Sequence, residues 1–240
     1  MKEEAGDQKT QQDNPVYSAM IESVDNNIGK ILESLKQTGQ YDNTIIVLVS
    51  DHGGLSNRGN KRPLATTNLP LRAGKGHLYE GGIKVPFMIH LPGQSKNYMS
   101  DVPVVTLDLL PTFADICDLR IETSRELDGV SLRPLLDKDK KTTLAKRDLF
   151  WHKAQERPIQ TGDYVSTAIR SGKYKLIDFY DQKRIELYDL SKDPEERNNL
   201  ASEKPAIVKE LMGKIVEWRH DFKVPMASKK TKVFKDKNYK

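Results

Sequence analysis

Cysteine is nearly absent from this sequence of 240 residues, which contains only Cys117. A single cysteine excludes an internal disulfide framework and any zinc site built from several cysteines. No stretch approaches the roughly 18 apolar residues that a membrane span needs, and the N-terminal stretch lacks the apolar segment of a signal peptide. The hydrophobic fraction of 37%, with 30% charged residues, nevertheless predicts a globular chain rather than a disordered one. At roughly 100–200 residues per domain, the length allows one large domain or two small ones.

The surplus of basic residues is confined to the C-terminus. The whole chain has a formal charge of +5, but residues 223–240 alone contain seven lysines and one aspartate. The rest of the chain is therefore nearly neutral. We interpret residues 225–240 as a solvated basic tail and expect no specific nucleic-acid binding, because no folded pattern accompanies the lysines.

The first half of the sequence begins with a well-marked helix pattern. Asn14 and Pro15 suit the first positions of a helix, and Gly39 suits its end. Apolar residues recur at helical spacing between these signals: Tyr17, Met20, Ile21, Val24, Ile28, Ile31, Leu32 and Leu35. The pattern predicts one helix with a wide apolar face.

A continuous β-branched and apolar run from Thr44 to Ser50 follows that helix. Such a run is typical of a strand buried on both faces of a parallel sheet. A second buried strand is predicted over residues 85–91, and a helix over residues 104–119 with Cys117 on its apolar face. Together these patterns predict an α/β architecture, with a mixed or parallel sheet flanked by helices.

The second half of the sequence has a different periodicity. Short strands are predicted at Thr167–Arg170, Tyr174–Phe179 and Ile185–Asp189, separated by turn residues, which is typical of an antiparallel meander. A last helix is predicted from about Pro205 to Arg219. We therefore expect a small α+β subdomain with an antiparallel sheet and a terminal helix, which follows a loop at residues 137–141.

Candidate functional residues lie beyond the first strand and in the long loop after it. Asp51 and His52 stand at a strand end, and a carboxylate beside an imidazole can bind a cation or serve as base and orienter. Lys75 lies between glycines that allow a ligand to approach closely, and its point charge suits an oxyanion. His77 is a candidate general acid or substrate contact. All three residue types are also common in ordinary turns and solvated loops.

Several segments of the chain are collinear with one family. They are TIIVLVSDHG (44–53), KGHLYEGGIKVP (75–86), DLLPT (108–112), LDGVSLRPLL (127–136) and ELYDLSKDPEERNNL (186–200). In this order they resemble the C-terminal half of the type I, arylsulfatase-like sulfatases of the alkaline-phosphatase superfamily, over residues 15–222. The resemblance implies that residues 14–140 form the C-terminal half of a catalytic domain and residues 141–224 a small closing subdomain. Residues 1–13 are then a polar N-terminal segment.

The resemblance also implies roles for the candidate residues. Asp51 and His52 resemble ligands of a divalent cation, most often Ca²⁺, but many members carry Asn at the second position, which leaves the metal's identity open. Lys75 resembles the lysine that binds a sulfate oxygen and stabilises charge on the leaving oxygen. His77 stands at a variable position and is expected to contact substrate. The expected substrate is a sulfated small molecule or carbohydrate.

The family's nucleophile is a formylglycine made from the Cys or Ser of a [C/S]-x-[P/A]-x-R motif, which is expected upstream of this chain. Cys117 does not fit the motif and is interpreted as a small core residue. Ser166 and Arg170 fit it formally but lie in a predicted ordinary strand. We therefore expect the chain alone to lack turnover. We also expect its sheet edge to need the missing N-terminal half or another chain as cover.

Two other functions remain open at the level of sequence. A metal-dependent phosphodiesterase or phosphatase of the same superfamily also carries Asp-His-Gly at a strand end, although its usual further histidine ligands are not recognisable here. A non-catalytic domain that keeps the fold for binding or assembly would also lack the nucleophile. The compartment cannot be read from the chain itself, and the family suggests a periplasmic, secreted or lysosomal protein.

Overall fold

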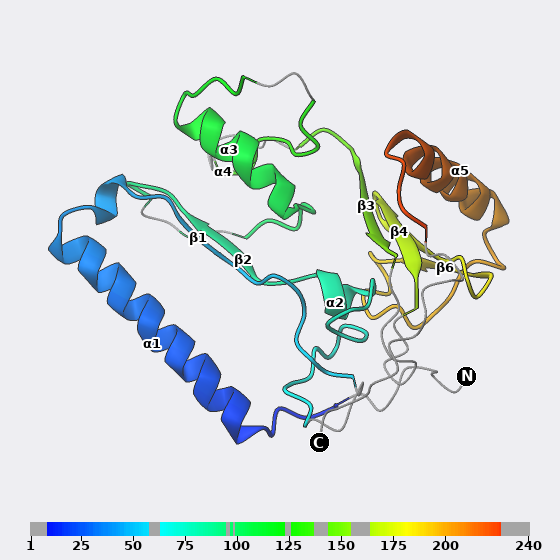
Figure 1. Ribbon diagram of the computed structural model, residues 1–240, viewed down its shortest axis with the longest axis horizontal. Coiled ribbons are helices and arrows are strands. Elements are labelled where there is room, and N and C mark those ends of the chain that lie inside the picture. The colour runs from blue at the N-terminus through cyan, green and yellow to red at the C-terminus, as the bar shows by residue number, and fades with distance from the viewer. Residues whose placement is uncertain are drawn as a thin grey trace. The chain divides into compact units, whose positions relative to one another are not determined.

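A computed structural model describes residues 9–57, 63–94, 97, 99–122, 126–136, 144–154 and 164–226 (Figure 1). The chain divides into two compact units, one of Met1–Gly93 with Asp148–Lys240 and one of Gln94–Arg147. The predicted loop at 137–141 lies outside the described residues, as does nearly all of the basic tail 225–240. The predicted segment boundaries after residues 13, 140 and 224 stay a prediction.

The first helix, α1 (Pro15–Gln37), begins and ends where the sequence indicates. The Asn14 side chain accepts a hydrogen bond from the Tyr17 backbone N–H at 3.1 Å, and Gly39 follows with a φ of +68°. None of its side chains is buried. On the predicted apolar face, Met20, Ile21, Val24 and Ile31 are exposed and the other four residues are half-buried. Among the residues that the structure describes, no helix is long and apolar enough to cross a membrane.

The next strands form a two-stranded sheet. After a short 3₁₀ turn, η1 (Tyr41–Asn43), β1 (Ile46–Val49) pairs with β2 (Phe87–His90), and α2 (Glu80–Ile83) lies between them in sequence. The prediction that β1 is buried in a parallel sheet is wrong for the described residues, because the two strands are antiparallel and Leu48 is 40% exposed. A continuous apolar run indicates a strand but carries no information about the direction of its neighbour.

The unit formed by residues 94–147 contains η2 (Thr106–Asp108), α3 (Leu109–Ile116) and α4 (Arg133–Leu136). The helix predicted over 104–119 is therefore shorter than expected. Cys117 caps its C-terminal end and is exposed, so the interpretation of Cys117 as a core residue is wrong. The helix ends at Ile116, and Asp118, with a φ of +53°, directs the chain away from the helix axis directly after Cys117.

Asp108 holds this small unit together. Its buried carboxylate accepts hydrogen bonds from both guanidinium nitrogens of Arg147 and from the backbone N–H groups of Val105 (2.9 Å) and Val130 (3.0 Å). Burial alone would raise the pKa of this carboxyl, but the hydrogen bonds from Arg147 and the backbone outweigh burial and hold the pKa below its usual value. One side chain thus joins three separate segments of the unit.

The second sheet is an antiparallel meander of β3 (Asp148–Lys153), β4 (Ser166–Ser171), β5 (Tyr174–Phe179) and β6 (Arg184–Asp189). The helix α5 (Pro205–Asp221) packs its apolar stripe on one face; the buried residues there are Ile169, Leu176, Leu187, Leu211 and Ile215. These contacts confirm the three predicted strands and the last helix. The sequence did not indicate β3, because Asp-Leu-Phe-Trp-His-Lys has no two-residue alternation.

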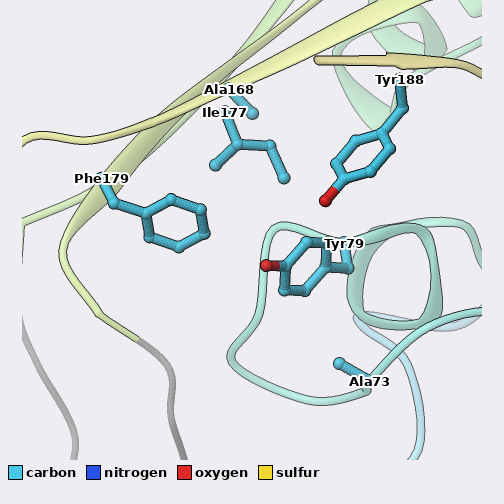
Figure 2. Packing of buried hydrophobic residues seen from close by; sticks show 6 residues of the cluster. All are labelled: Ala73, Tyr79, Ala168, Ile177, Phe179 and Tyr188. Atoms are coloured by element: carbon cyan, nitrogen blue, oxygen red, sulfur yellow. The ribbon is translucent and has the colours of Figure 1, made fainter. Parts of the chain in front are cut away.

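The opposite face of this sheet packs against the loop that precedes α2. Ala168, Ile177, Phe179 and Tyr188 of the sheet form a buried cluster with Ala73 and Tyr79 of that loop. Figure 2 shows Tyr79 between Ala73 and the sheet residues Ile177 and Tyr188. These contacts attach the loop that carries Lys75 to the second sheet.

Candidate functional site

Asp51 and His52 lie directly after β1. The Asp51 side chain is 83% exposed, and its Oδ2 lies 3.2 Å from Nε2 of His52. The other ring nitrogen, Nδ1 of His52, lies 3.0 Å from the Gly53 carbonyl oxygen, which can only accept a hydrogen. The proton of a neutral imidazole therefore belongs on Nδ1, and the lone pair of Nε2 faces the Asp51 carboxylate. Two electron-pair donors that converge in this way need a proton or a cation between them.

Close glycine contacts join this strand end to the loop that carries Lys75. The Gly53 N–H donates to the Gly82 carbonyl oxygen at 3.0 Å, and a Cβ atom at Gly53 would lie 1.7 Å from the Gly81 carbonyl oxygen. Only a residue without a side chain allows this approach. The two segments are consequently in direct backbone contact.

Lys75 sits on the same junction. Its backbone N–H donates to the Gly54 carbonyl oxygen at 3.0 Å, two residues beyond His52, and its side chain is half-buried. Gly76 follows with a φ of +95°, a conformation that favours glycine and turns the chain directly after the lysine. The structure therefore brings the segments of Asp51, His52 and Lys75 together.

His77 is placed differently from the other candidates. Its side chain is buried, and its ring stacks on that of Tyr79 with 6.1 Å between the centroids. Its role as a substrate contact stays a prediction.

Ser166, the formal match to the nucleophile motif, is buried in β4, and its hydroxyl donates to the Tyr164 carbonyl oxygen at 3.1 Å. That position is an ordinary strand position.

A buried ion network fixes the other end of the Lys75 loop. The ammonium nitrogen of Lys175, on β5, lies 2.9 Å from Oε1 of Glu80 and 2.8 Å from Oε1 of Glu196. The second oxygen of Glu196 accepts the backbone N–H of Glu80 at 2.7 Å. Burial raises the pKa of the Glu196 carboxyl, although the nearby Lys175 opposes that shift. The start of α2 is thus held by charges in the sheet and in the loop beyond β6.

Arg72 and Tyr79 add hydrogen bonds that join the same loop to β6 and to the loop beyond it. One guanidinium nitrogen of Arg72 donates to the Tyr188 hydroxyl (2.9 Å) and to the Glu196 carbonyl oxygen (2.8 Å). The hydroxyls of Tyr79 and Tyr188 both donate to Oε2 of Glu186, at 2.7 and 2.8 Å. Burial, reinforced by the Glu186 carboxylate, raises the pKa of both phenols, so both remain proton donors.

Sequence reasoning missed this network. A usable signal was present: Lys175 and Glu186 are charged residues that stand beside apolar residues inside the predicted strands, and such charges are rarely buried without partners. Which residues would pair with them could not be read from that pattern.

The described ranges do not contain a complete set of metal ligands. No group of three or more His, Cys, Asp or Glu side chains there is close enough together to hold a metal ion. Asp51 and His52 therefore supply two donors at most from this part of the chain. Calcium usually takes six to eight oxygen ligands. Asp51 and His52 could therefore form only part of a calcium site, and their role as metal ligands stays a prediction.

Two family models match the chain. The model described as "N-sulphoglucosamine sulphohydrolase, C-terminal" covers residues 73–221, and the model described as "Sulfatase" covers residues 2–119. Between them they include Asp51, His52, Lys75 and His77. The "Sulfatase" model matches the N-terminal part of the chain and the other model matches the C-terminal part, and the two ranges overlap.

Curated sulfatases show the same similarity. The sulfatase YdeN of Escherichia coli, itself uncharacterized, is 31% identical over 239 residues, which cover 88% of this chain and 41% of the relative. An N-acetylglucosamine-6-O-sulfatase of Bacteroides thetaiotaomicron is 32% identical over 214 residues, which cover 86% of this chain and 36% of the relative. The chain thus spans about two fifths of the length of these curated relatives.

Solved structures support the fold. Ps i-CgsB in complex with k-i-k-neocarrahexaose has a TM-score of 0.70 at 30% identity, over 87% of this chain and 44% of that one. BT4656 in complex with its substrate D-glucosamine-2-N,6-O-disulfate has a TM-score of 0.61 at 28% identity, over 85% of this chain and 39% of that one. These matches confirm the predicted alkaline-phosphatase-like α/β fold. The chain therefore belongs to the sulfatase family and corresponds to the C-terminal portion of its members.

Proposed function

We propose that this chain forms the C-terminal part of a sulfate ester hydrolase and supplies part of its cation and sulfate site. One observation carries the proposal: the backbone contacts of Gly53 and Gly54 place Asp51 and His52 beside the Lys75 loop. The segments that carry a carboxylate, an imidazole and a lysine then meet at one strand end. Such a set can hold a cation and an anion together.

We assign Asp51 and His52 to a divalent cation, with Ca²⁺ as the first choice. The exposed Asp51 carboxylate suits a hard cation, and Nε2 of His52 has its lone pair toward the same space. When bound, the cation would neutralise negative charge on the sulfate group. Imidazole suits calcium less well than an amide oxygen does, so a transition-metal ion is the alternative occupant.

Lys75 is assigned to a sulfate oxygen. Its ammonium group would bind the ester and would stabilise the negative charge that grows on the leaving oxygen. The glycines on either side leave room for the sulfate group to approach. His77, buried two residues later, is assigned to the substrate side of the same turn.

The nucleophile is expected from a segment outside these 240 residues. In the family it is a formylglycine, and the covalent step that it permits divides the reaction barrier. We accordingly expect residues 1–240 alone to release no sulfate from an ester. The exposed apolar faces of α1, β1 and β2 are expected to be covered by the rest of such a domain or by another chain.

A sulfated carbohydrate is the proposed substrate class. The support comes from relatives: the Bacteroides thetaiotaomicron enzyme is an N-acetylglucosamine-6-O-sulfatase, and BT4656 is complexed with a glucosamine disulfate. The chain covers 36% and 39% of these two proteins, so the assignment concerns the complete enzyme.

Nuclear magnetic resonance of the purified 240-residue chain tests the proposal. Inorganic sulfate, titrated in the presence of calcium chloride, should shift the backbone amide signals of Gly74 and Gly76, and Lys75→Ala should abolish this response. Lys192→Ala, at an exposed position, is the matched control. An unchanged sulfate response in Lys75→Ala would refute the role of Lys75. Sulfate release from a chromogenic ester by the chain alone would refute the expected external nucleophile, and Ser166→Ala would be the next variant.

A further inference from the structure

The side-chain amide of Asn68 lies between the two segments of the candidate site. Its Oδ1 accepts the Gly54 backbone N–H at 2.9 Å. Its Nδ2 donates to the Gly54 carbonyl oxygen (2.9 Å), the Ala73 carbonyl oxygen (3.0 Å) and the Ser56 hydroxyl (3.1 Å). Both polar atoms of this amide are therefore used, and all of their partners belong to the two segments.

The geometry is specific for asparagine. The amide pairs with both the N–H and the carbonyl group of Gly54, as a neighbouring β-strand would. An aspartate has the same size but offers only acceptors, so it would face the carbonyl oxygens of Gly54 and Ala73 without a donor. The surroundings are tight, because a Cβ atom at Gly74 would lie 2.5 Å from Nδ2 of Asn68.

Asn68 is connected to each set of candidate ligands by a short piece of backbone. Gly54 follows His52 by two residues, and Ala73 precedes Lys75 by two residues. The Gly54 carbonyl oxygen also accepts the Lys75 N–H, at 3.0 Å. The Asn68 amide thus forms hydrogen bonds with the backbone that follows Asp51 and His52 and with the backbone that precedes Lys75.

We propose that Asn68 is a positioning residue that fixes Lys75 relative to Asp51 and His52, an inference that rests on the proposed function. Asn68 acts through the backbone of Gly54 and Ala73 and is not itself assigned a contact with substrate. Its loss should leave the second sheet and α5 intact, because their core consists of other residues. The loop that carries Lys75 should then no longer keep a fixed position beside the end of β1.

The test compares Asn68→Asp and Asn68→Ala with Asn26→Asp, a control at an exposed position of α1. Amide hydrogen exchange of Gly54 and Lys75 measures how well the contact between their two segments is maintained. A titration with inorganic sulfate in the presence of calcium chloride measures the sulfate affinity of the site. Both variants should exchange these amides at least about tenfold faster and bind sulfate about tenfold more weakly, the equivalent of one lost hydrogen bond. Protection of the α5 amides should match that of the control.

A pH series adds a readout that a general loss of stability would not produce. The carboxyl group of the Asn68→Asp variant gains a hydrogen when it is protonated, so acidification should restore protection of Lys75 in this variant and not in Asn68→Ala.

Unchanged exchange of Lys75 and unchanged sulfate binding in both variants would overturn the proposal. Loss of α5 protection in both variants would also overturn it, because Asn68 would then be required for the fold as a whole. If the unsubstituted chain shows no sulfate response while exchange at Lys75 still depends on Asn68, the proposed function fails and the positioning role stands.

Discussion

The ammonium nitrogen of Lys175 lies 2.9 Å from Oε1 of Glu80, and the two side chains are only 0% and 6% exposed. The residues are 95 positions apart in sequence, so the ion pair joins the Lys75 loop to β5. A buried pair of this kind contributes less to net stability than to geometry, because desolvation offsets much of the attraction. Its removal from one side, however, leaves a buried charge without a partner.

Lys175→Met should therefore destabilise the chain by about 3–5 kcal/mol, because the buried Glu196 carboxylate would lose its cation and Glu80 would keep the more distant Arg170, at 3.8 Å. Urea unfolding followed by circular dichroism measures the change. Lys192→Met, at an exposed position, should stay within about 0.5 kcal/mol of the unsubstituted chain. A loss below about 1 kcal/mol for Lys175→Met would show that the two carboxylates find other partners.

Asp108→Asn should destabilise the unit of residues 94–147 in a pH-dependent way. The pKa of Asp108 is below its usual 3.8 in the folded state, so the ionised carboxylate contributes stability above pH 3.8, and this contribution is lost as the pH falls through the lower folded value. At pH 7 the variant should be less stable by about 3 kcal/mol.

Urea unfolding between pH 7 and pH 3, monitored by hydrogen exchange in this unit, tests that expectation. The difference between the unsubstituted chain and Asp108→Asn should shrink as the pH decreases. Asp101→Asn, at an exposed position in the same unit, is the matched control. A difference that does not vary with pH would contradict the assigned role of the carboxylate charge.

Gly53→Ala should damage the junction between β1 and the Lys75 loop. The new Cβ atom would meet the backbone oxygen of Gly81 at 1.7 Å, so the two segments would have to separate, at a cost of about 1–3 kcal/mol. Gly213→Ala on α5 is the opposite case, because nothing lies within 4 Å of the added atom. That variant should gain about 0.5–1 kcal/mol. Thermal unfolding measures the stability of both variants. Equal unfolding temperatures for Gly53→Ala and Gly213→Ala would exclude a close contact between β1 and the Lys75 loop.

In the full-length protein, Asp51→Ala should weaken calcium binding, because the site loses one of its few anionic ligands. Isothermal titration with calcium chloride, after removal of bound metal with EDTA, measures this directly. His52→Asn should be milder, since an amide oxygen replaces the imidazole nitrogen as a ligand. Lys75→Ala should leave calcium binding unchanged. Wild-type affinity in Asp51→Ala would remove this residue from the proposed site.

Local sequence signals predicted most elements of this chain. Asn14 and Pro15 mark the start of α1, and the alternating runs of β4 to β6 are recognisable because each depends on neighbouring residues only. The direction of β2 beside β1 and the exposure of Cys117 were not predictable in the same way. The first depends on a strand far away in sequence, and the second on where α3 ends, which is at Ile116.

The sequence by itself determined the helices α1 and α5, the antiparallel strands β4 to β6 and the motif residues Asp51, His52 and Lys75. Only the tertiary structure decided that Glu80 shares Lys175 with Glu196, and that Asn68 bridges Gly54 and Ala73. The physical reason is that helix and strand patterns arise from contacts a few residues apart. A buried charge or amide is stable only where distant segments supply its partners at hydrogen-bond distance, and that placement exists only in the folded chain.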